Sequence, residues 1–164
     1  MIRDSFHLYE SHLTNAFAER PAFRQEFEVT APGVVKVALD CETKHRGIVN
    51  GVIVVAARIK YRKASTQAGL ATAPLSDIPG AVGGGNIYNI TDHYHTLHIG
   101  GNLPVAPGWY RFEVHMCSDS SIPHTDGTCG QISNQSNPAP SPTACYNRFT
   151  TEEKPGETYG YSAS

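Results

Sequence analysis

The feature that most constrains this chain is a regular alternation of apolar and polar residues over three separate runs. In Val34–Glu42 the apolar residues share one side and the charged residues occupy the other. The same two-residue period appears in Val52–Lys63 and in Trp109–Cys117. Successive side chains of a β-strand point to opposite faces, so this period predicts strands with one buried face. Three such runs predict a protein built from sheets around a shared core.

The rest of the pattern extends this prediction to a two-layer β domain. Shorter or less regular runs at Phe27–Val29 and Ile87–Ile99 predict two further strands. Residues 64–86 are rich in Ala, Gly and Pro and predict a long connection without regular structure. The chain has 164 residues, the length of one ordinary domain. Several antiparallel strands of this kind predict an all-β antiparallel sandwich of jelly-roll type.

The N-terminal segment carries a different period. Apolar residues recur at three- and four-residue spacing from Phe6 to Phe17, which is typical of an amphipathic helix. Residues suited to an N-cap precede this run, and Pro21 follows it. We therefore predict a short helix over residues 5–20, within an N-terminal arm that spans residues 1–22.

The C-terminal segment differs again in composition. Residues 118–164 hold few large apolar side chains and are dominated by Pro, Ser, Asn, Thr and Gly. Such a segment buries too little apolar surface to offset its ordering entropy alone. We predict a sandwich domain at residues 23–117. It is followed by an extended arm at residues 118–164, which is ordered by disulfides or by neighbouring subunits. Cys129 and Cys145 are predicted to form a disulfide there, with reduced thiols as the alternative.

Composition argues against two classes of protein. Charged residues make up 17% of the chain and the net charge is −2, whereas proteins that bind nucleic-acid phosphates carry a basic excess. No apolar stretch approaches the roughly 20 residues of a membrane-spanning helix. We expect no nucleic-acid partner and no membrane span. A surface with so few charges is suited to contact with neighbouring subunits.

Histidines supply the sharpest chemical motif. His93 and His95 would project from one face of a strand about 7 Å apart, close enough to bind one metal ion. If this strand pairs with Trp109–Cys117, then Glu113 and His115 lie beside them. Three imidazoles and a carboxylate suit a divalent transition metal such as Zn or Fe. The alternative is that these histidines bind nothing and lie at a surface or an interface.

The same motif carries two resemblances. The His93–His95 pair, with a Pro-Gly turn ahead of His115, resembles the metal-binding pattern of cupins, which are jelly-roll barrels. That resemblance implies a metal-dependent enzyme, although the glutamate that cupins carry shortly after the pair is missing here. The H-x-H tripeptide is also similar to that of trimeric phage fibres, in which it binds a metal on the threefold axis.

Aromatic and basic residues suggest other ligands. Trp109, Tyr88 and Tyr94 are candidates for stacking on sugar rings, with packing at the rim of the core as the alternative for Trp109. Arg58, Lys60, Arg62 and Lys63 form a basic stripe that would suit an anionic glycan or phosphate. We interpret this stripe as charges that protect a strand edge from wrong pairing. The Gly83–Gly85 run lacks the pattern of a phosphate loop and is interpreted as a flexible loop.

These observations favour a non-enzymatic structural subunit of an extracellular or virion assembly, such as a capsid decoration, fibre or filament component. It would form homo-oligomers or larger assemblies and would be located outside the cell or on a virion surface. The first alternative is a carbohydrate-binding module or adhesin. The second is a cupin-like, metal-dependent enzyme.

Overall fold

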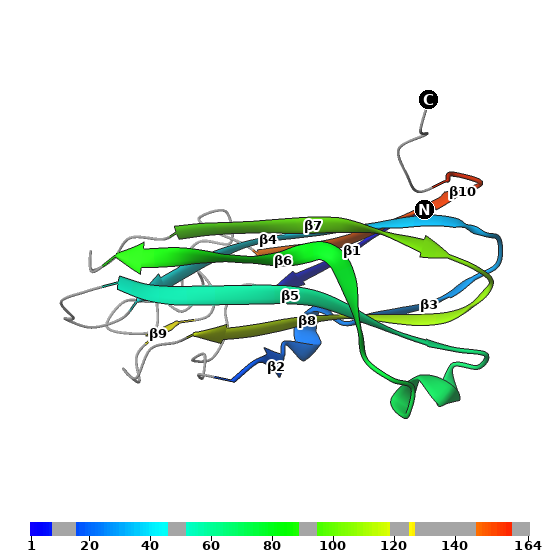
Figure 1. Ribbon diagram of the computed structural model, residues 1–164, viewed down its shortest axis with the longest axis horizontal. Coiled ribbons are helices and arrows are strands. Elements are labelled where there is room, and N and C mark those ends of the chain that lie inside the picture. The colour runs from blue at the N-terminus through cyan, green and yellow to red at the C-terminus, as the bar shows by residue number, and fades with distance from the viewer. Residues whose placement is uncertain (8–15, 46–51, 89–94, 119–124, 127–146, 159–164) are drawn as a thin grey trace.

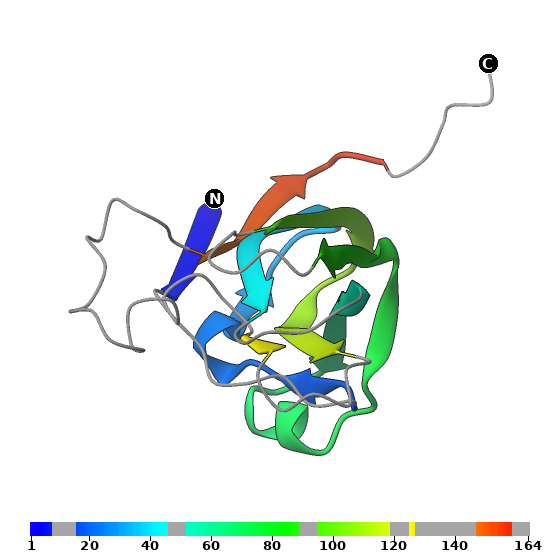
Figure 2. The same ribbon diagram turned by 90° about the vertical axis from the view of Figure 1, so that its left-hand side faces the viewer.

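The protein consists of two five-stranded antiparallel sheets that pack face to face (Figures 1 and 2). The computed structural model describes residues 1–7, 16–45, 52–88, 95–118, 125–126 and 147–158. The first sheet has the order β1 (Ile2–His7), β10 (Asn147–Pro155), β4 (Gly33–His45), β7 (His95–Val105), and β9 (Thr125–Asp126) pairs with the end of β4. These findings confirm the prediction of an antiparallel, sandwich-like β protein.

In the second sheet β8 (Gly108–Ser118) holds the central position. The strands on one side of it are β2 (Ala18–Glu19) and β3 (Gln25–Val29), and those on the other side are β5 (Val52–Ala64) and then β6 (Ser76–Tyr88). Two short 3-10 helices, η1 (Pro21–Phe23) and η2 (Ala68–Ala71), complete the described elements. None of the described helices is long and apolar enough to cross a membrane.

The strands pair in a nested order along the chain. β1 pairs with β10, β3 with β8, β4 with β7, and β5 with β6, in each case antiparallel. The chain therefore doubles back on itself between β5 and β6, and the resulting pairs are divided between the two sheets. Strands that are distant in sequence become neighbours, which is why the first and last described strands lie side by side.

The core lies between the two sheets and follows the alternation in the sequence. On β4 the side chains of Val35, Val37, Leu39 and Cys41 are buried, and on β8 those of Tyr110, Phe112, Val114 and Met116 are buried. Phe27 and Phe112 stack with ring centroids 5.5 Å apart. Full burial of one such side chain contributes roughly 1.5–3 kcal/mol. The alternation therefore predicted the inner faces of these strands correctly.

The predicted N-terminal helix is wrong wherever the structure describes it. The backbone of β1 forms a ladder with Asn147–Glu152 over its whole length, and Ala18–Glu19 form a strand against β8. Residues 8–15 of the predicted helix lie outside the described residues. A short helix is marginal in water without tertiary packing, and here pairing with a distant strand satisfies the backbone instead.

The side chain of Arg3 helps to fix β1 in place. Its guanidinium lies 3.7 Å from the centroid of the Phe27 ring, across the gap between the sheets, and pairs with Glu153 at 2.5 Å. Gln25 of β3 spans the same gap, donating hydrogen bonds to the backbone oxygens of Arg3 and Phe149 and accepting one from Thr151. This side of the sandwich is closed by polar contacts as well as by packing.

The C-terminal arm predicted for residues 118–164 contains a core strand. Asn147–Pro155 is β10, which lies between β1 and β4, and the side chain of Phe149 is completely buried. The sandwich thus draws strands from both sides of the predicted body at 23–117. The sequence pattern missed β10 because its buried face carries Asn147, Phe149 and Thr151, of which only Phe149 has a large apolar side chain. The predicted partners Cys129 and Cys145 lie outside the described residues.

The long connection predicted for residues 64–86 is also wrong. It contains η2 and most of β6, which pairs with β5 from Val52 to Tyr61. The single strand predicted at Ile87–Ile99 is divided: its first two residues end β6 and its last five begin β7, in different sheets. Glycine in a strand is a weak signal because it has no side chain to show the two-residue period.

Gly83 is present because β6 and β7 approach each other closely where the two sheets meet (Figures 1 and 2). A Cβ atom at this position would overlap the Cγ2 atom of Ile99, which is buried on β7. The Gly83–Gly85 run is therefore part of a strand, and its interpretation as a flexible loop is wrong. Because Gly83 has no side chain, it permits the close contact between β6 and β7 at this point.

Substitution of Gly83 by alanine is expected to lower the free energy of unfolding by about 1–3 kcal/mol, because the new methyl group overpacks the contact with Ile99. Urea denaturation followed by circular dichroism would measure this loss. Val82→Ala, at an exposed neighbour on the same strand, is the control and should change stability by less than about 0.5 kcal/mol. If Ile99 is the cause, Gly83→Ala should cost less in an Ile99→Ala background.

Candidate functional site

The structure separates the residues that the sequence grouped as metal ligands. His95 begins β7, where its backbone pairs with Thr43 in the first sheet. Glu113 and His115 lie on β8 in the second sheet. His93 lies outside the described residues. Nowhere in the described ranges do three or more His, Cys, Asp or Glu side chains form a group that could hold a metal ion.

The expected hairpin between these strands is wrong. β7 pairs with β4, whereas β8 pairs with β2, β3 and β5. The connection from Val105 to Gly108 crosses from one sheet to the other. The hydroxyl of Tyr110 fixes this crossing by hydrogen bonds with the backbone N–H and C=O groups of Ala106, at 3.2 and 3.1 Å. The sequence of a Pro-Gly turn is the same whether the turn joins two neighbouring strands of one sheet or carries the chain from one sheet to the other.

Glu113 is the centre of a charged cluster on the outer face of the second sheet. Its carboxylate accepts hydrogen bonds from Arg62 Nε at 2.9 Å and from His115 Nε2 at 2.8 Å. Arg111 lies 3.9 Å from the same carboxylate and donates to Glu26 of β3 at 2.6 Å. Although it projects away from the core, Glu113 is only 1% exposed, since the side chains of Arg62, Arg111 and His115 surround it.

The cluster holds Glu113 in its ionised form. Burial alone would raise the pKa of this carboxyl group, but the hydrogen bonds from His115 and Arg62, together with their charges, outweigh burial and lower its pKa. Arg62 also donates from Nη1 to the backbone oxygen of Ala73 at 2.5 Å. The ionised Glu113 therefore connects β8 and β5 directly, and through Arg62 it connects them to the segment that follows η2.

The basic stripe of β5 does not protect a strand edge, because β5 lies inside its sheet between β6 and β8. Three of its four cations have a close partner among the described residues. Arg62 pairs with Glu113, Lys60 pairs with Asp77 at 3.1 Å, and the guanidinium of Arg58 lies 3.7 Å from the centroid of the Phe17 ring. Lys60 and Arg62 therefore have acidic partners within the molecule, whereas Arg58 packs on an aromatic ring and Lys63 is exposed.

The outer face of the first sheet is a second polar surface and is more open. We define it as the outward residues of β1, β10, β4 and β7. Lys36 and Asp40 on β4 are exposed, and the carboxylate of Asp40 accepts a hydrogen bond from Nδ1 of His98 on β7. On β10, Arg148 lies directly across from Asp40, and Glu152 lies directly across from Lys36. The middle of this face carries small residues.

The three candidate sugar-stacking residues are not brought together by the described part of the chain. Trp109 is half-buried on the outer face of the second sheet, paired with Glu28 and with Ala64 on either side. Tyr88 ends β6, and its backbone pairs with Val52 at the opposite end of β5 from Ala64. Tyr94 lies outside the described residues.

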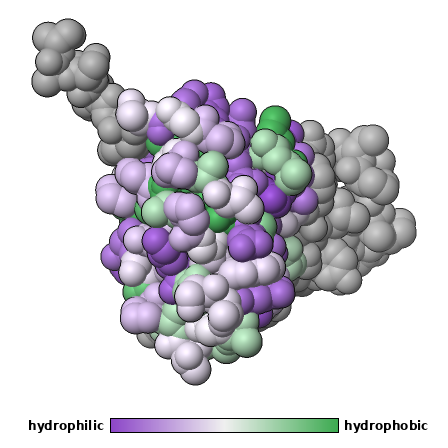
Figure 3. All heavy atoms as spheres, turned by 90° about the vertical axis from the view of Figure 1, so that its right-hand side faces the viewer, coloured by the Kyte–Doolittle hydropathy of each residue, from purple (hydrophilic) through white to green (hydrophobic). Residues whose placement is uncertain are grey.

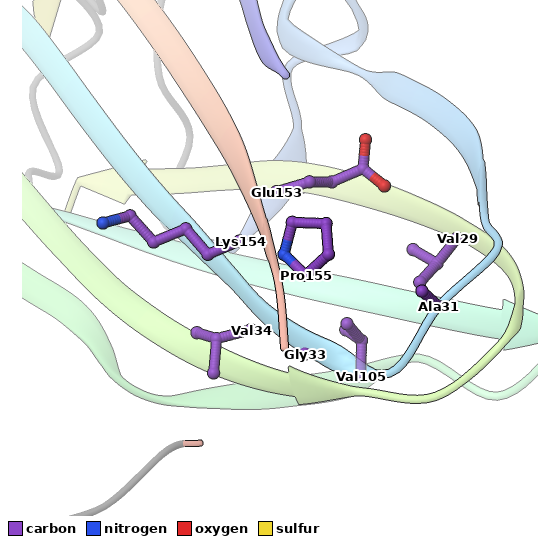
Figure 4. A pocket seen from close by; sticks show the side chains of 8 residues that line it. All are labelled: Val29, Ala31, Gly33, Val34, Val105, Glu153, Lys154 and Pro155. Carbon is purple, nitrogen blue, oxygen red and sulfur yellow. The ribbon is translucent and has the colours of Figure 1, made fainter. Parts of the chain in front are cut away.

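A small hollow lies at the end of the sandwich where β4 begins and β10 ends (Figure 4). It is lined by Val29, Ala31, Gly33, Val34, Val105, Glu153, Lys154 and Pro155. Its open space is about that of one water molecule, whereas small-molecule sites typically enclose about 300–1,000 Å³. The surface around this end mixes hydrophilic and hydrophobic residues without a large apolar area (Figure 3).

The sequence missed the residues that surround Glu113. The two-residue period placed Arg62 and Arg111 on outward faces and gave no assignment for Glu26, and the contacts among them depend on which strands are neighbours. Opposite charges in runs of two-residue period were the signal that could have suggested them. Comparison with known protein families and with curated protein sequences gives no match to this chain.

Proposed function

We propose that this protein is a non-enzymatic subunit of an extracellular or virion assembly, built on a jelly-roll sandwich. The observation that carries this proposal is the nested strand order. The first strand pairs with the last, and the following strands pair in the same inward sequence across two sheets. This is the strand order expected of two Greek keys rolled into a jelly roll, a fold used by capsid and lectin domains.

A fold does not determine a function, so the surfaces must supply the rest of the argument. The outer face of the first sheet is exposed and carries charges of both signs on adjacent strands. Such a surface is suited to another protein, because opposite charges across an interface select the partner and the register. The outer face of the second sheet has its charges paired internally around Glu113, which suits a rigid support.

Native mass spectrometry before and after treatment with a chelator tests this proposal. We expect a symmetric oligomer or a larger particle whose mass does not change when the chelator is added. A monomer that loses a stoichiometric metal ion and an activity to the chelator would contradict the proposal and favour the cupin-like alternative.

Carbohydrate binding is the second candidate, and the half-buried Trp109 favours it. Its indole lies on an outer face beside Glu28, and an aromatic ring with a polar neighbour is a common sugar platform. A monomer that binds glycans on an array, and loses that binding in Trp109→Ala with folding retained, would replace the assembly proposal with this one.

A further inference from the structure

The outer face of the first sheet has an internal symmetry in its charges. In one row across the strands, Glu152 of β10 lies opposite Lys36 of β4. Two rows further along the sheet face, Arg148 of β10 lies opposite Asp40 of β4. The order of acid and base is thus reversed between the two rows. The row between them pairs Thr150 with Ala38 and continues to Gly100 of β7.

We propose that this face binds the same face of a second copy of the chain, about a twofold axis that runs across the strands along the row of Thr150 and Ala38. The rotation exchanges the rows on either side of the axis. Lys36 of one copy then faces Asp40 of the other, and Glu152 faces Arg148. Both opposite-charge contacts occur twice because the interface is isologous.

Three features of the face support a second copy as the occupant. Its charged residues are accessible: the side chains of Asp40 and Arg148 are 54% and 43% exposed. Lys36 and Glu152 form no ion pair with any other described residue, so both can bind across an interface. Small residues in the central row let two sheets approach to about 10 Å, the spacing of aligned sheets in a sandwich.

The rim of the interface is compatible with the same rotation. Asp4 at the edge of the central row would face its own copy, but its charge is already balanced by Arg148 at 3.3 Å and by the hydroxyl of Thr150 at 2.6 Å. Four strands about 4.8 Å apart and the three outward rows related by the rotation, about 6.8 Å apart, give roughly 400 Å² per copy. This area is small for a specific interface and predicts a weak, transient dimer.

This inference deepens the proposed function and rests on it, and charge reversal tests it separately. Sedimentation velocity of the full chain over a concentration series would measure the dimer dissociation constant. Lys36→Glu and Glu152→Lys are each expected to weaken the dimer about tenfold or more, because like charges then face each other twice. The double variant Lys36→Glu with Asp40→Lys is expected to restore the dissociation constant to within about threefold of the wild type.

Glu28→Lys is the matched control, since Glu28 is an exposed glutamate on the outer face of the second sheet and should leave the dimer unchanged. Circular dichroism of each variant checks that the fold is retained. If the charge-reversal variants all assemble with the dissociation constant of the wild type, this interface is overturned and the proposed function still stands. Wild-type protein that stays monomeric at the highest concentration would overturn both, and a double variant that remains dissociated would overturn the twofold pairing.

Discussion

Replacement of Phe149 by alanine is expected to lower the free energy of unfolding by about 3–5 kcal/mol. Phe149 is fully buried in the core on β10, a strand that lies between β1 and β4. Removal of the ring would leave a cavity in a region held by strands from both ends of the described chain. Urea denaturation followed by circular dichroism would measure the change.

The result distinguishes a C-terminal segment that forms a core strand from one that forms an arm outside the core. If residues 147–155 formed an arm outside the core, the same substitution would change the stability of the isolated domain by less than about 0.5 kcal/mol. Lys154→Ala, at a half-buried position near the end of β10, is the control and should have such a small effect. Phe149→Leu keeps much of the side-chain volume and should cost clearly less than Phe149→Ala.

Replacement of Glu113 by alanine is expected to lower the free energy of unfolding by about 2–4 kcal/mol. Removal of one partner of a buried ion pair leaves the other charge uncompensated, which typically costs about 3–5 kcal/mol. Arg62 and Arg111 keep side-chain exposures of 24% and 16%, so water relieves part of that cost. A substitution at the exposed Glu28 by alanine should change stability by less than about 0.5 kcal/mol.

The pH dependence of stability provides an independent readout of Glu113. Because its pKa is lower in the folded state than in the unfolded chain, its stabilisation is fully present above the ordinary glutamate pKa of about 4.3. The stabilisation is lost as the pH falls through the lower, folded-state pKa. Glu113→Gln should therefore be less stable than the wild type near neutral pH, and the difference should shrink on acidification. A difference that is constant down to the acid transition would show that Glu113 is not held ionised by its cluster.

Local sequence determined which residues face the core. In β4 and β8 the two-residue period alone assigned the buried side chains correctly, because the alternation of side chains is a property of the strand itself. The same reasoning failed at β6 and β10, where glycine and threonine give the alternation little apolar contrast.

Local sequence patterns did not predict which strands pair with each other. The apolar spacing after Phe6 suits a helix in isolation, yet residues 2–7 form a strand because β10 is available to pair with them. The proposed His95 cluster required β7 to pair with β8, and the crossing at Ala106–Pro107 places these strands in different sheets. Each choice depends on contacts between segments up to 150 residues apart, such as Arg3 with Glu153.

By itself, the sequence determined a β protein and the inner faces of its most regular strands, because the two-residue period of a strand depends only on consecutive residues. Only the tertiary structure decided which strands became neighbours. That choice assembled the cluster around Glu113 and the reversed charge rows of the first sheet. Both arise because pairing energy is gained between strands distant in the chain, and nothing in either strand alone specifies its partner.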